Sequence, residues 1–370
     1  MRVEGLALED WRNYERQSVD LAPGLNLVTG ANAQGKTNLL EAIYCLTGFG
    51  SPRAADAALV RHGCERALLH AAVERRGRSV RVDLEVRPGK GTRALLNKTP
   101  VQTRVLNDVC VSVFFGPDEL SLVKGSPDGR RRFLDELVVK LRPARDGLRR
   151  EFERTLKQRN ALLKSAPRGG SGTVTATLDV WDAALARAGA ALAAARLEAL
   201  AGLVPLAAKR YAEIAGAGTL ALEYASSWMD AGVSPDAATL ETRLRAAIAE
   251  ARPREIERGV GLVGPQRDDV SVVLGGVDAR VYASQGDQRT CALALKLAEH
   301  DLLSDALGEE PVLLLDDVFS ELDPSRRAWL ADAVRSIGQT VVSTAEPVAV
   351  DALAPAATFA VAAGTVVRSA

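Results

Sequence analysis

The sequence has 370 residues, of which 47% are hydrophobic, 25% charged and 4% aromatic. A chain of this length is expected to form two domains, and this composition excludes a disordered or fibrous protein. Lysine and arginine together number 47, as do aspartate and glutamate, so the formal net charge is zero. The molecule as a whole therefore has no electrostatic attraction to nucleic acid or to an anionic membrane, and any such partner must be held by a local patch.

Targeting and metal-binding signals are weak throughout the sequence. The N-terminal segment carries charges along its whole length, and no later run approaches about 18 uncharged apolar residues. We therefore expect a cytoplasmic protein with no membrane partner. The four cysteines and three histidines form no close cluster, which predicts reduced thiols and no zinc site.

The first predicted elements follow the order strand, loop, helix. A strand is expected at Leu25–Thr29, then a glycine-bounded loop from Gly30, then a helix at Thr37–Leu46. Alternating apolar residues predict a hairpin with strands at Ser79–Val86 and Thr92–Leu96.

The middle of the chain changes to a helical pattern. A second pair of strands is expected at Val109–Phe115, after which residues from about Leu120 to Arg252 show helical spacing rich in alanine, leucine, arginine and glutamate. A loop is expected within this region at Ser165–Thr175, where glycine, serine and threonine gather. These features predict a helical domain.

Strand composition returns in the last third of the sequence. A hairpin is expected with strands at Val270–Leu274 and Val277–Tyr282, since two glycines separate them. A helix at Gln288–Leu307 then leads to a short apolar run, Val312–Leu315, which suits a strand buried on both faces.

The strongest chemical signal is GANAQGKT, from Gly30 to Thr37, which fits the phosphate-binding pattern G-x-x-x-x-G-K-[ST] between a strand and a helix. Backbone N–H groups of such a loop, together with the positive end of the helix, bind phosphate oxygens. Lys36 should reach the β and γ phosphates of ATP, and the Thr37 hydroxyl should help hold Mg²⁺. A chance match by a glycine-containing turn is the alternative. The residues expected to line the nucleotide site are Gly30, Ala31, Asn32, Ala33, Gln34, Gly35, Lys36, Thr37 and Asn38.

Two aspartates follow the apolar run and complete this predicted catalytic site. Asp316 emerges at the carboxyl end of a strand, where open sheets bind ligands, and is the expected Mg²⁺ carboxylate. Asp317 stands where a general base could orient the attacking water. Because an aspartate reaches one methylene less far than the glutamate common at that place, we expect slow hydrolysis. Apolar strands that end in aspartate are often purely structural, but the pairing with the phosphate loop favours catalysis.

Nearly the whole chain separates these two elements, which predicts an α/β head assembled from both chain ends with an inserted helical domain. We expect the head at residues 1–118 and 259–370 and the mainly helical insertion at residues 119–258. The segment Ser284–Gln288 opens a helix just before Asp316 and resembles the signature loop of ABC-type ATPases. Taken alone, that segment is an ordinary N-capped helix start.

In the ABC superfamily the signature loop contacts the γ-phosphate held by a second head, so the resemblance implies an ATP-bound homodimer. Ser284 and Gly286 would then bind nucleotide. The segment Ser320–Pro324 follows at the spacing of the superfamily's D-loop, which crosses the dimer interface. The residues expected at that interface are Ser284, Gln285, Gly286 and Asp323.

Several longer segments resemble the RecF recombination-repair proteins: WRNY, TGANAQGKTNLLEAIYCLTG, FFGPDEL, VKGSPDGRRRFLDE, GPQRDD, SQGDQRTCALALKLAEHDLL and LLLDDVFSELD. The resemblance covers most of the chain. It implies an ATP-driven dimerising clamp that binds double-stranded and gapped DNA at single-strand/duplex junctions and helps to load recombinase with RecR and RecO partners. It also implies a weak, DNA-stimulated ATPase used as a switch.

Some positions depart from this family's usual pattern. Ala33 replaces a common glycine, so either its φ is negative or the loop is strained. Gln266 and Asp287 also differ from the common residues, and we assign neither a catalytic role. Arg12 and Asn13 match the place where related repair ATPases contact base and ribose, although a surface arginine is an equal alternative.

Two segments carry the local positive charge that DNA binding requires. Residues 124–164 contain thirteen lysines and arginines against six acidic residues, and residues 74–98 contain eight against three. The alternative is a solvated helical face and a charged hairpin edge. The arginines taken as candidate DNA contacts are Arg75, Arg76, Arg78, Arg130, Arg131 and Arg132.

Two other functions remain open: a transporter motor subunit and the head of a chromosome-organising protein. Transporter heads carry a switch histidine after the strand that here reads Thr340–Ser343, where this chain offers only Thr344. A middle region of about 130 residues without sustained heptads is too short and irregular for a long coiled-coil arm. The sequence therefore favours the DNA clamp.

Overall fold

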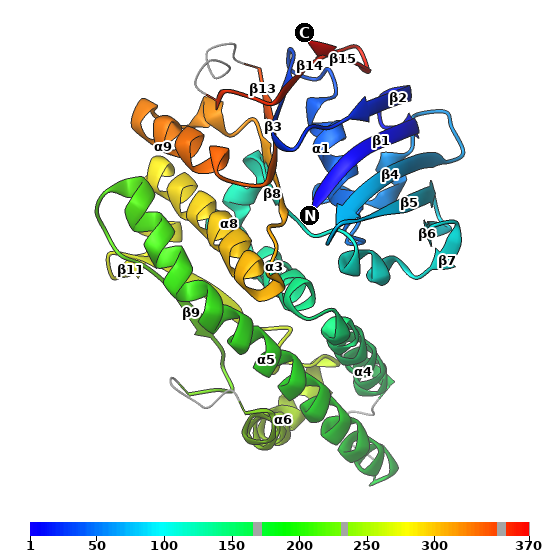
Figure 1. Ribbon diagram of the computed structural model, residues 1–370. Coiled ribbons are helices and arrows are strands. Elements are labelled where there is room, and N and C mark those ends of the chain that lie inside the picture. Colours follow the sequence, from blue (N-terminus) through cyan, green and yellow to red (C-terminus); the bar gives the residue numbers. More distant parts are fainter. Residues whose placement is uncertain (166–171, 231–235, 346–352, 370) are drawn as a thin grey trace. The chain divides into compact units, whose positions relative to one another are not determined.

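The chain folds into two compact units, seen in a computed structural model that describes residues 1–165, 172–230, 236–345 and 353–369 (Figure 1). The head unit comprises Met1–Leu120, Leu206–Gly218 and Ser284–Ala370, and the helical unit comprises Ser121–Pro205 and Thr219–Ala283. The expected α/β head built from both chain ends is confirmed. The domain limits predicted after residue 118 and before residue 259 remain predictions.

The first sheet of the head unit is antiparallel, with strand order β2-β1-β4-β5-β6-β7. Apolar residues alternate along its strands and face one core, as Leu6 and Leu8 do on β1. The predicted hairpin at Ser79–Val86 and Thr92–Leu96 is confirmed as β5 and β6. Its strands are β1 (Arg2–Trp11), β2 (Tyr14–Asp20), β4 (Ala67–Arg75), β5 (Arg78–Arg87), β6 (Gly91–Leu96) and β7 (Thr99–Val101).

The second sheet holds the predicted strand before the phosphate loop and has the order β15-β14-β3-β13-β12-β8. Five strands run parallel and only β15 is antiparallel, so the carboxyl ends of β3, β13 and β12 lie along one edge. Its strands are β3 (Gly24–Thr29), β8 (Ser112–Phe115), β12 (Val312–Asp316), β13 (Gln339–Thr344), β14 (Ala357–Ala362) and β15 (Thr365–Ser369).

The prediction of two strands at Val109–Phe115 is wrong. Only β8 forms there, while Val109 ends a 3-10 helix, Thr103–Asp108. All four residues of β8 are buried although it is an edge strand, because helices α1 and α8 both pack against it. Apart from Ser112 the segment is apolar, and a short run of this kind is typical of one buried strand.

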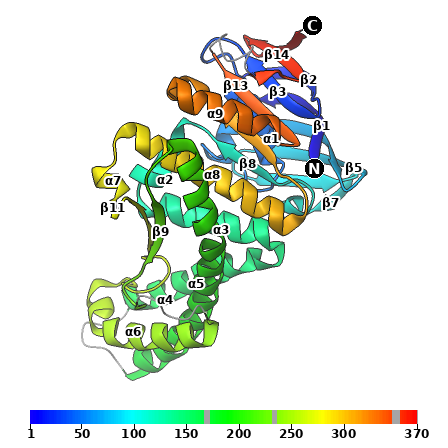
Figure 2. The ribbon, with the colours of Figure 1, turned by 60° about the vertical axis from the view of Figure 1, so that its left-hand side comes forward.

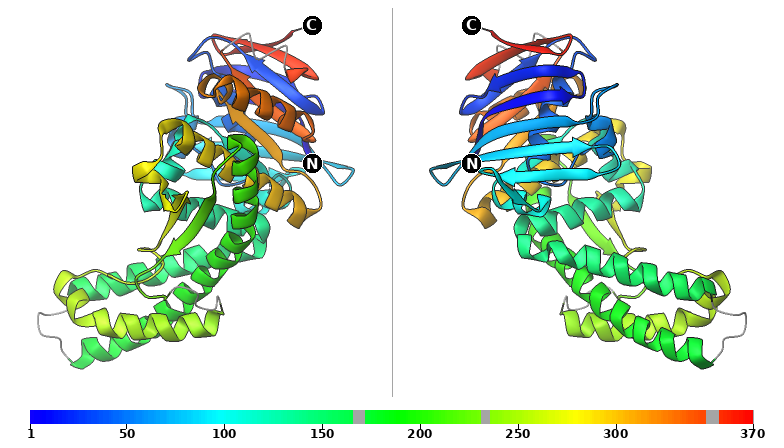
Figure 3. Two further views of the ribbon diagram at one scale, coloured as in Figure 1. Left: turned by 90° about the vertical axis from the view of Figure 1, so that its left-hand side faces the viewer. Right: turned by 90° about the vertical axis from the view of Figure 1, so that its right-hand side faces the viewer.

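Helix α1 (Lys36–Cys45) lies between the two sheets of the head unit, as Figures 2 and 3 show. Leu39, Leu40 and Ile43 of this helix share one hydrophobic core with residues of both sheets. Helices α8 (Gln285–Leu307) and α9 (Pro324–Arg335) pack against the second sheet, at β8 and β3 respectively. The layers are therefore sheet, helix, sheet and helix pair. Because α1 follows β3 after a short loop, its first turn lies at the carboxyl edge of the second sheet.

The helical unit is built around three long helices that enclose Phe152, Leu244 and Ile248 (Figure 2). Helix α5 begins in this unit and continues into the head unit after Pro205. The helices of the chain outside the head layers are α2 (Ser121–Lys124), α3 (Pro127–Leu141), α4 (Asp146–Ser165), α5 (Gly172–Ala215), α6 (Ala237–Arg258) and α7 (Ala279–Tyr282). Besides Thr103–Asp108, the described residues form 3-10 helices at Asp56–Leu59, Pro117–Leu120, Pro143–Arg145 and Phe319–Glu321.

A three-stranded sheet in the helical unit departs from the predicted pattern. Strand β10 (Asp269–Leu274) pairs with β9 (Leu220–Ala225), which the helical prediction for the middle region missed, and with β11 (Val277–Asp278). The predicted hairpin strand at Val277–Tyr282 is therefore only two residues long. It stops because the Asp278 side chain accepts a hydrogen bond from the Arg280 N–H and caps α7. Most of the predicted loop at Ser165–Thr175 lies outside the described residues.

One helical segment of the described chain, Ala176–Ala215, is long and apolar enough to cross a membrane by length and composition alone. Half of its most apolar window is buried inside the protein, as in the core helix of a globular domain. Its alanines and leucines pack in the cores described above rather than forming a continuous exposed apolar surface.

Candidate functional site

The phosphate loop runs from Gly30 to Gly35 and turns β3 into α1. Its backbone has positive φ at Gly30, Ala33 and Gly35, with values of 151°, 63° and 120°. Ala33 is therefore left-handed, and the strained alternative foreseen from the sequence is the one observed. The positive end of α1 faces this loop, as phosphate binding requires.

The side chain of Lys36 is folded over the loop. Its ammonium donates hydrogen bonds to the carbonyl oxygens of Gly30, at 2.9 Å, and Ala31, at 3.2 Å, and lies 3.7 Å from Asp317 Oδ2. Only 4% of the residue is exposed. A buried cation on the inner side of a phosphate loop can interact strongly with phosphate oxygens, because little water screens it.

Thr37, Asp316 and Ser343 meet beside this lysine, although they come from α1, β12 and β13. The hydroxyls of Thr37 and Ser343 both donate to Asp316 Oδ1, at 2.9 Å and 2.6 Å. Burial raises the pKa of Asp316 and the neighbouring Asp317 raises it further, while the two hydroxyl hydrogen bonds act in the opposite direction. The predicted pairing of Thr37 with Asp316 is thus a direct contact in the structure.

Asp317 occupies the next position, with a left-handed backbone (φ 51°) held by hydrogen bonds from its N–H to Ser343. Its Oδ1 atom is buried and has no hydrogen-bond partner. Asp317 lines a cavity of about 20 Å³ together with Gly116, Arg289 and Glu321. A volume of this size is enough for one water molecule.

The turn between β1 and β2 reaches the phosphate loop through Asn13. The Asn13 amide donates to the Gln34 carbonyl oxygen at 2.8 Å, and its Oδ1 accepts from Asn38 at 2.8 Å. Arg12 instead forms a two-pronged ion pair with the fully buried Glu41, with distances of 2.7 Å and 2.6 Å. The Arg12 guanidinium thereby orders the start of α1.

Sequence reasoning missed the carboxylate that Arg12 binds. Glu41 also accepts hydrogen bonds from Ser51 and Arg53, and these partners lower its pKa against the effect of burial, which raises it. Glu41 lies one turn after Thr37 on α1, so a buried glutamate in an apolar helix is the signal that could have indicated a paired arginine.

The signature-like segment forms the start of α8. Ser284 is the N-cap, and its hydroxyl accepts from the Asp287 N–H and donates to the Asp287 carboxylate at 2.8 Å. Arg326 of α9 lies 3.4 Å from Asp287 and 3.3 Å from Asp323. The predicted interface residues Ser284, Gly286 and Asp323 are thereby brought together around Arg326, whose guanidinium would come 3.1 Å from a Cβ atom at Gly286. Gln285 is the first residue of the same helix.

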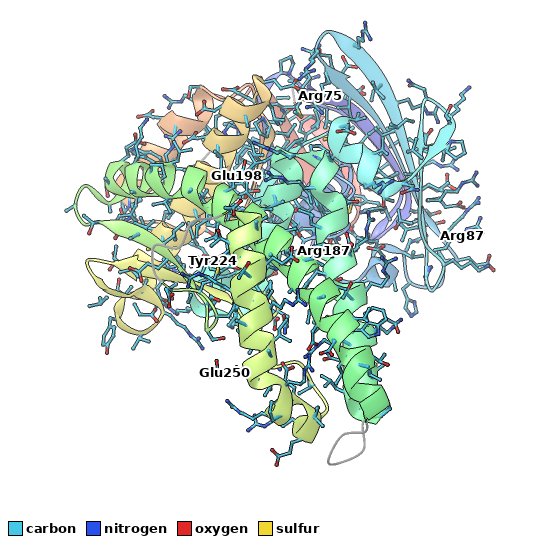
Figure 4. All side chains as sticks on the ribbon, turned by 90° about the horizontal axis from the view of Figure 1, so that it is seen from below. Arg75, Arg87, Arg187, Glu198, Tyr224 and Glu250 are labelled. Carbon is cyan, nitrogen blue, oxygen red and sulfur yellow. The ribbon has the colours of Figure 1, made fainter. Side chains whose placement is uncertain are left out.

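The candidate DNA-contacting arginines divide into those with internal contacts and those with exposed side chains. Arg75 is paired with Glu309, Arg130 forms a two-pronged ion pair with Asp269, and Arg131 donates to the main chain of Asp268. The side chain of Arg76 is 73% exposed and lies 3.7 Å from Glu309, and that of Arg132 is 49% exposed and pairs with Glu136 at 2.9 Å. Arg78, at the first position of β5, is also exposed. Figure 4 labels Arg75 and Arg87, which belong to neighbouring strands of the first sheet.

The residues at the edge of the second sheet fit a magnesium-bound nucleotide. Thr37 and Asp316 offer two oxygens 2.9 Å apart, Asp317 Oδ1 lacks a partner, and Lys36 supplies a buried cation. No group of three or more histidine, cysteine, aspartate and glutamate side chains in the described parts of the chain could hold a metal by itself. Any divalent ion here would need ligands from the nucleotide or from water.

A family model described as the RecF/RecN/SMC N terminal domain matches residues 2–363. A Streptomyces avermitilis protein named DNA replication and repair protein RecF is 48% identical over the full length of both chains. A Frankia alni protein of the same name is 44% identical, again over 100% of each chain.

Solved structures agree with these relatives. One described as the recombination mediator protein RecF with ATP in the RecFOR pathway has a TM-score of 0.92 and 28% identity, covering 100% of this chain and 97% of the other. An Smc head bound to the C-winged helix domain of ScpA has a TM-score of 0.58 at 16% identity, covering 100% and 98%, which is a likeness of fold alone. The resemblance predicted from the motifs is confirmed, and the chain belongs to the RecF family within the RecF/RecN/SMC group.

Proposed function

We propose that this chain is an ATP-dependent DNA-binding protein of recombinational repair that acts as an ATP-driven clamp at DNA gaps and single-strand/duplex junctions. The observation that carries the proposal is the meeting of Lys36, Thr37, Asp316 and Asp317 at one sheet edge in a chain that matches relatives named DNA replication and repair protein RecF over its full length. Because its relatives are named for DNA replication and repair, we also propose that the protein is cytoplasmic and has no membrane partner.

The nucleotide proposed for this site is ATP with Mg²⁺. ATP supplies the γ-phosphate, and Mg²⁺ would neutralise phosphate charge. Backbone N–H groups of the phosphate loop and the Lys36 ammonium bind the phosphates. Thr37 and Asp316 are the residues that would hold the ion. Asn13, and the face of Arg12 left free by its ion pair with Glu41, lie beside the ribose and base.

Asp317 acts as the general base. Asp317 lines a cavity with room for one water and its Oδ1 has no hydrogen-bond partner, which suits a carboxylate that accepts a proton from the attacking water. The short aspartate side chain makes hydrolysis slow, and DNA binding stimulates it. Hydrolysis then resets the clamp.

ATP binding drives formation of a homodimer in which the signature segment of one head meets the nucleotide of the other. Ser284 and Gly286 would bind the partner's γ-phosphate, and Gln285 and Asp323 would lie at the dimer interface. The ion pairs of Arg326 with Asp287 and Asp323 support this role, because they hold the signature segment and the D-loop segment as one piece.

The proposed DNA contacts are the candidate arginines whose side chains are exposed: Arg76 and Arg78 on the head unit and, separately, Arg132 on the helical unit. Arg75, Arg130 and Arg131 serve the fold instead, since their side chains are no more than 16% exposed and their guanidinium groups contact other parts of the protein. Mediator proteins of the RecR and RecO type are the proposed partners in recombinase loading.

Substitution of Asp317 tests the catalytic part of this proposal. Asp317→Asn should reduce ATP turnover on the order of 100-fold, because it removes the general base, while dimer formation with Mg-ATP is kept or prolonged. Asp305→Asn, at an exposed position on α8, is the matched control and should leave turnover unchanged. Light scattering supplies the dimer measurement, and a single monomeric mass for every protein, with and without ATP and DNA, would overturn the clamp.

A further inference from the structure

The phosphate loop is held from outside by the turn of the C-terminal hairpin formed by β14 and β15. Gln34, the residue before Gly35 in the loop, contacts this turn with both its side chain and its main chain. Its Oε1 accepts a hydrogen bond of 2.7 Å from the Ala363 N–H. Its carbonyl oxygen accepts from the Gly364 N–H at 3.3 Å, in addition to the bond from Asn13 described above.

The packing around these contacts leaves little freedom. A Cβ atom at Gly30 would come within 2.3 Å of the Val361 carbonyl oxygen, and one at Gly364 within 2.5 Å of the Asn13 carbonyl oxygen. Gly364 also has a positive φ of 74°. The hairpin, the β1–β2 turn and the phosphate loop therefore fit together at distances that only glycine allows.

The loop residue that most needs support from this packing is Ala33. Its φ of 63° lies in the left-handed region, which an alanine adopts unfavourably and a glycine readily. A loop with alanine here would tend to relax to another conformation, and its N–H groups would then turn away from the phosphates. The next residue along the chain is Gln34, which is fixed by three hydrogen bonds from two other segments.

We propose that the turn at Ala363–Gly364 is a positioning element of the nucleotide site, which holds Gln34 and thereby keeps Ala33 in the left-handed conformation that binds phosphate. The inference rests on the proposed function in one respect, that the loop binds a nucleotide. It adds a role for the C-terminal hairpin and makes Gln34 a positioning residue. It also explains how this chain tolerates an alanine at position 33.

The test is calorimetric titration of the full chain with Mg-ADP, which lacks the γ-phosphate and so needs no second head. Gln34→Ala removes the side-chain hydrogen bond and should weaken ADP binding about 3- to 10-fold. Gln17→Ala is the matched control, since Gln17 contacts the same hairpin through both the N–H and the carbonyl of Val366. This control should leave ADP affinity unchanged, whatever its effect on the melting temperature.

The decisive variant is Gln34→Ala combined with Ala33→Gly. Because glycine is left-handed without support, the loss caused by Gln34→Ala should shrink to less than about 2-fold in the Ala33→Gly background. An equal loss in both backgrounds would show that Gln34 contacts the nucleotide directly, and no loss in either would show that the turn is only structural. Both results overturn the inference, whereas absence of ADP binding by the unmodified protein overturns the proposed function instead.

Discussion

The edge of the second sheet in the head unit and the core of the helical unit use charged residues in opposite ways. At the sheet edge, a buried polar atom, Asp317 Oδ1, has no hydrogen-bond partner. In the helical unit, Arg159 is fully buried and paired with Asp182 and Glu255, at 2.5 Å and 2.6 Å, and Arg196 is paired with Asp135. One guanidinium nitrogen of Arg159, Nη1, also lacks a hydrogen-bond partner, but its Nε and Nη2 atoms both donate to carboxylates of the same unit. The sheet edge is therefore suited to bind a ligand, whereas the charged groups of the helical unit mainly bind one another.

This contrast shows that the number of basic residues in a segment does not measure how much of its surface can bind DNA. The segment 124–164 has a large excess of lysine and arginine, yet Arg130 and Arg159 are both buried in ion pairs within the protein. Such groups stabilise one packing of the helices and are not accessible to phosphates. Four variants test these two uses of charged residues.

The largest effect is expected for the fully buried arginine. Arg159→Met leaves the buried Glu255 without its cationic partner and should lower the free energy of unfolding by about 3–5 kcal/mol. Arg187→Met, at the exposed position on α5 labelled in Figure 4, is the control and should change it by less than about 0.5 kcal/mol. Urea unfolding measures both, and equal midpoints would contradict the structural role given to Arg159.

At the sheet edge the expected effect is on function and not on the fold. Lys36→Ala removes the buried cation of the phosphate loop and should lower ATP turnover on the order of 100-fold. Lys90→Ala, at the exposed β5–β6 turn, should have no effect. Steady-state ATP hydrolysis distinguishes the two variants. Full activity of Lys36→Ala would mean that the nucleotide binds elsewhere.

A pH-dependent effect of intermediate size is expected in the helical unit. Burial raises the pKa of Asp268 from 3.8 to about 6, although Ser226, Tyr224 and Trp228 donate hydrogen bonds to it. Figure 4 labels Tyr224. Because the folded state favours the protonated acid, this stabilisation is complete below pH 3.8 and is lost as the pH rises through about 6.

Asp268→Asn removes this titration. Between pH 4 and pH 6.5 the unmodified protein should lose on the order of 1–3 kcal/mol more of its free energy of unfolding than the variant does. Urea unfolding at the two pH values gives the difference. Parallel pH profiles would mean that Asp268 is charged throughout this range in the folded protein.

The smallest effect is expected at the exposed arginines. Arg76→Glu with Arg78→Glu should weaken binding to duplex DNA about tenfold and reduce the salt slope by about 0.9 for each phosphate that the protein no longer neutralises. Arg245→Glu with Arg254→Glu changes the same charge on exposed positions of α6 and is the control. If both pairs reduce affinity equally, only net charge matters and the proposed surface is wrong.

The parts of the site that the sequence predicted are those built from contiguous residues. The phosphate loop, Asp316 and the signature segment each lie on one element, so their local pattern indicates their place. The contact of Thr37 with Asp316 was predictable as well, because the carboxyl ends of parallel strands share one edge.

Contacts between distant segments were not predictable in the same way. The apolar neighbours of Glu41 indicate that it needs a cationic partner, but not that Arg12 supplies it, and no local pattern pairs Gln34 with Ala363; both contacts depend on how distant segments pack. The pairing of β9 with β10 was missed for the same reason, since six residues inside a helical region become a strand only when a partner strand is available.

Closure of the clamp on DNA by nucleotide can be measured from the anisotropy of a labelled gapped duplex titrated with the full chain, with and without Mg-ATP, at two salt concentrations. Binding should be tighter, sigmoidal and salt-sensitive when Mg-ATP is present. Identical binding curves with and without Mg-ATP, or no binding in either state, would contradict this closure.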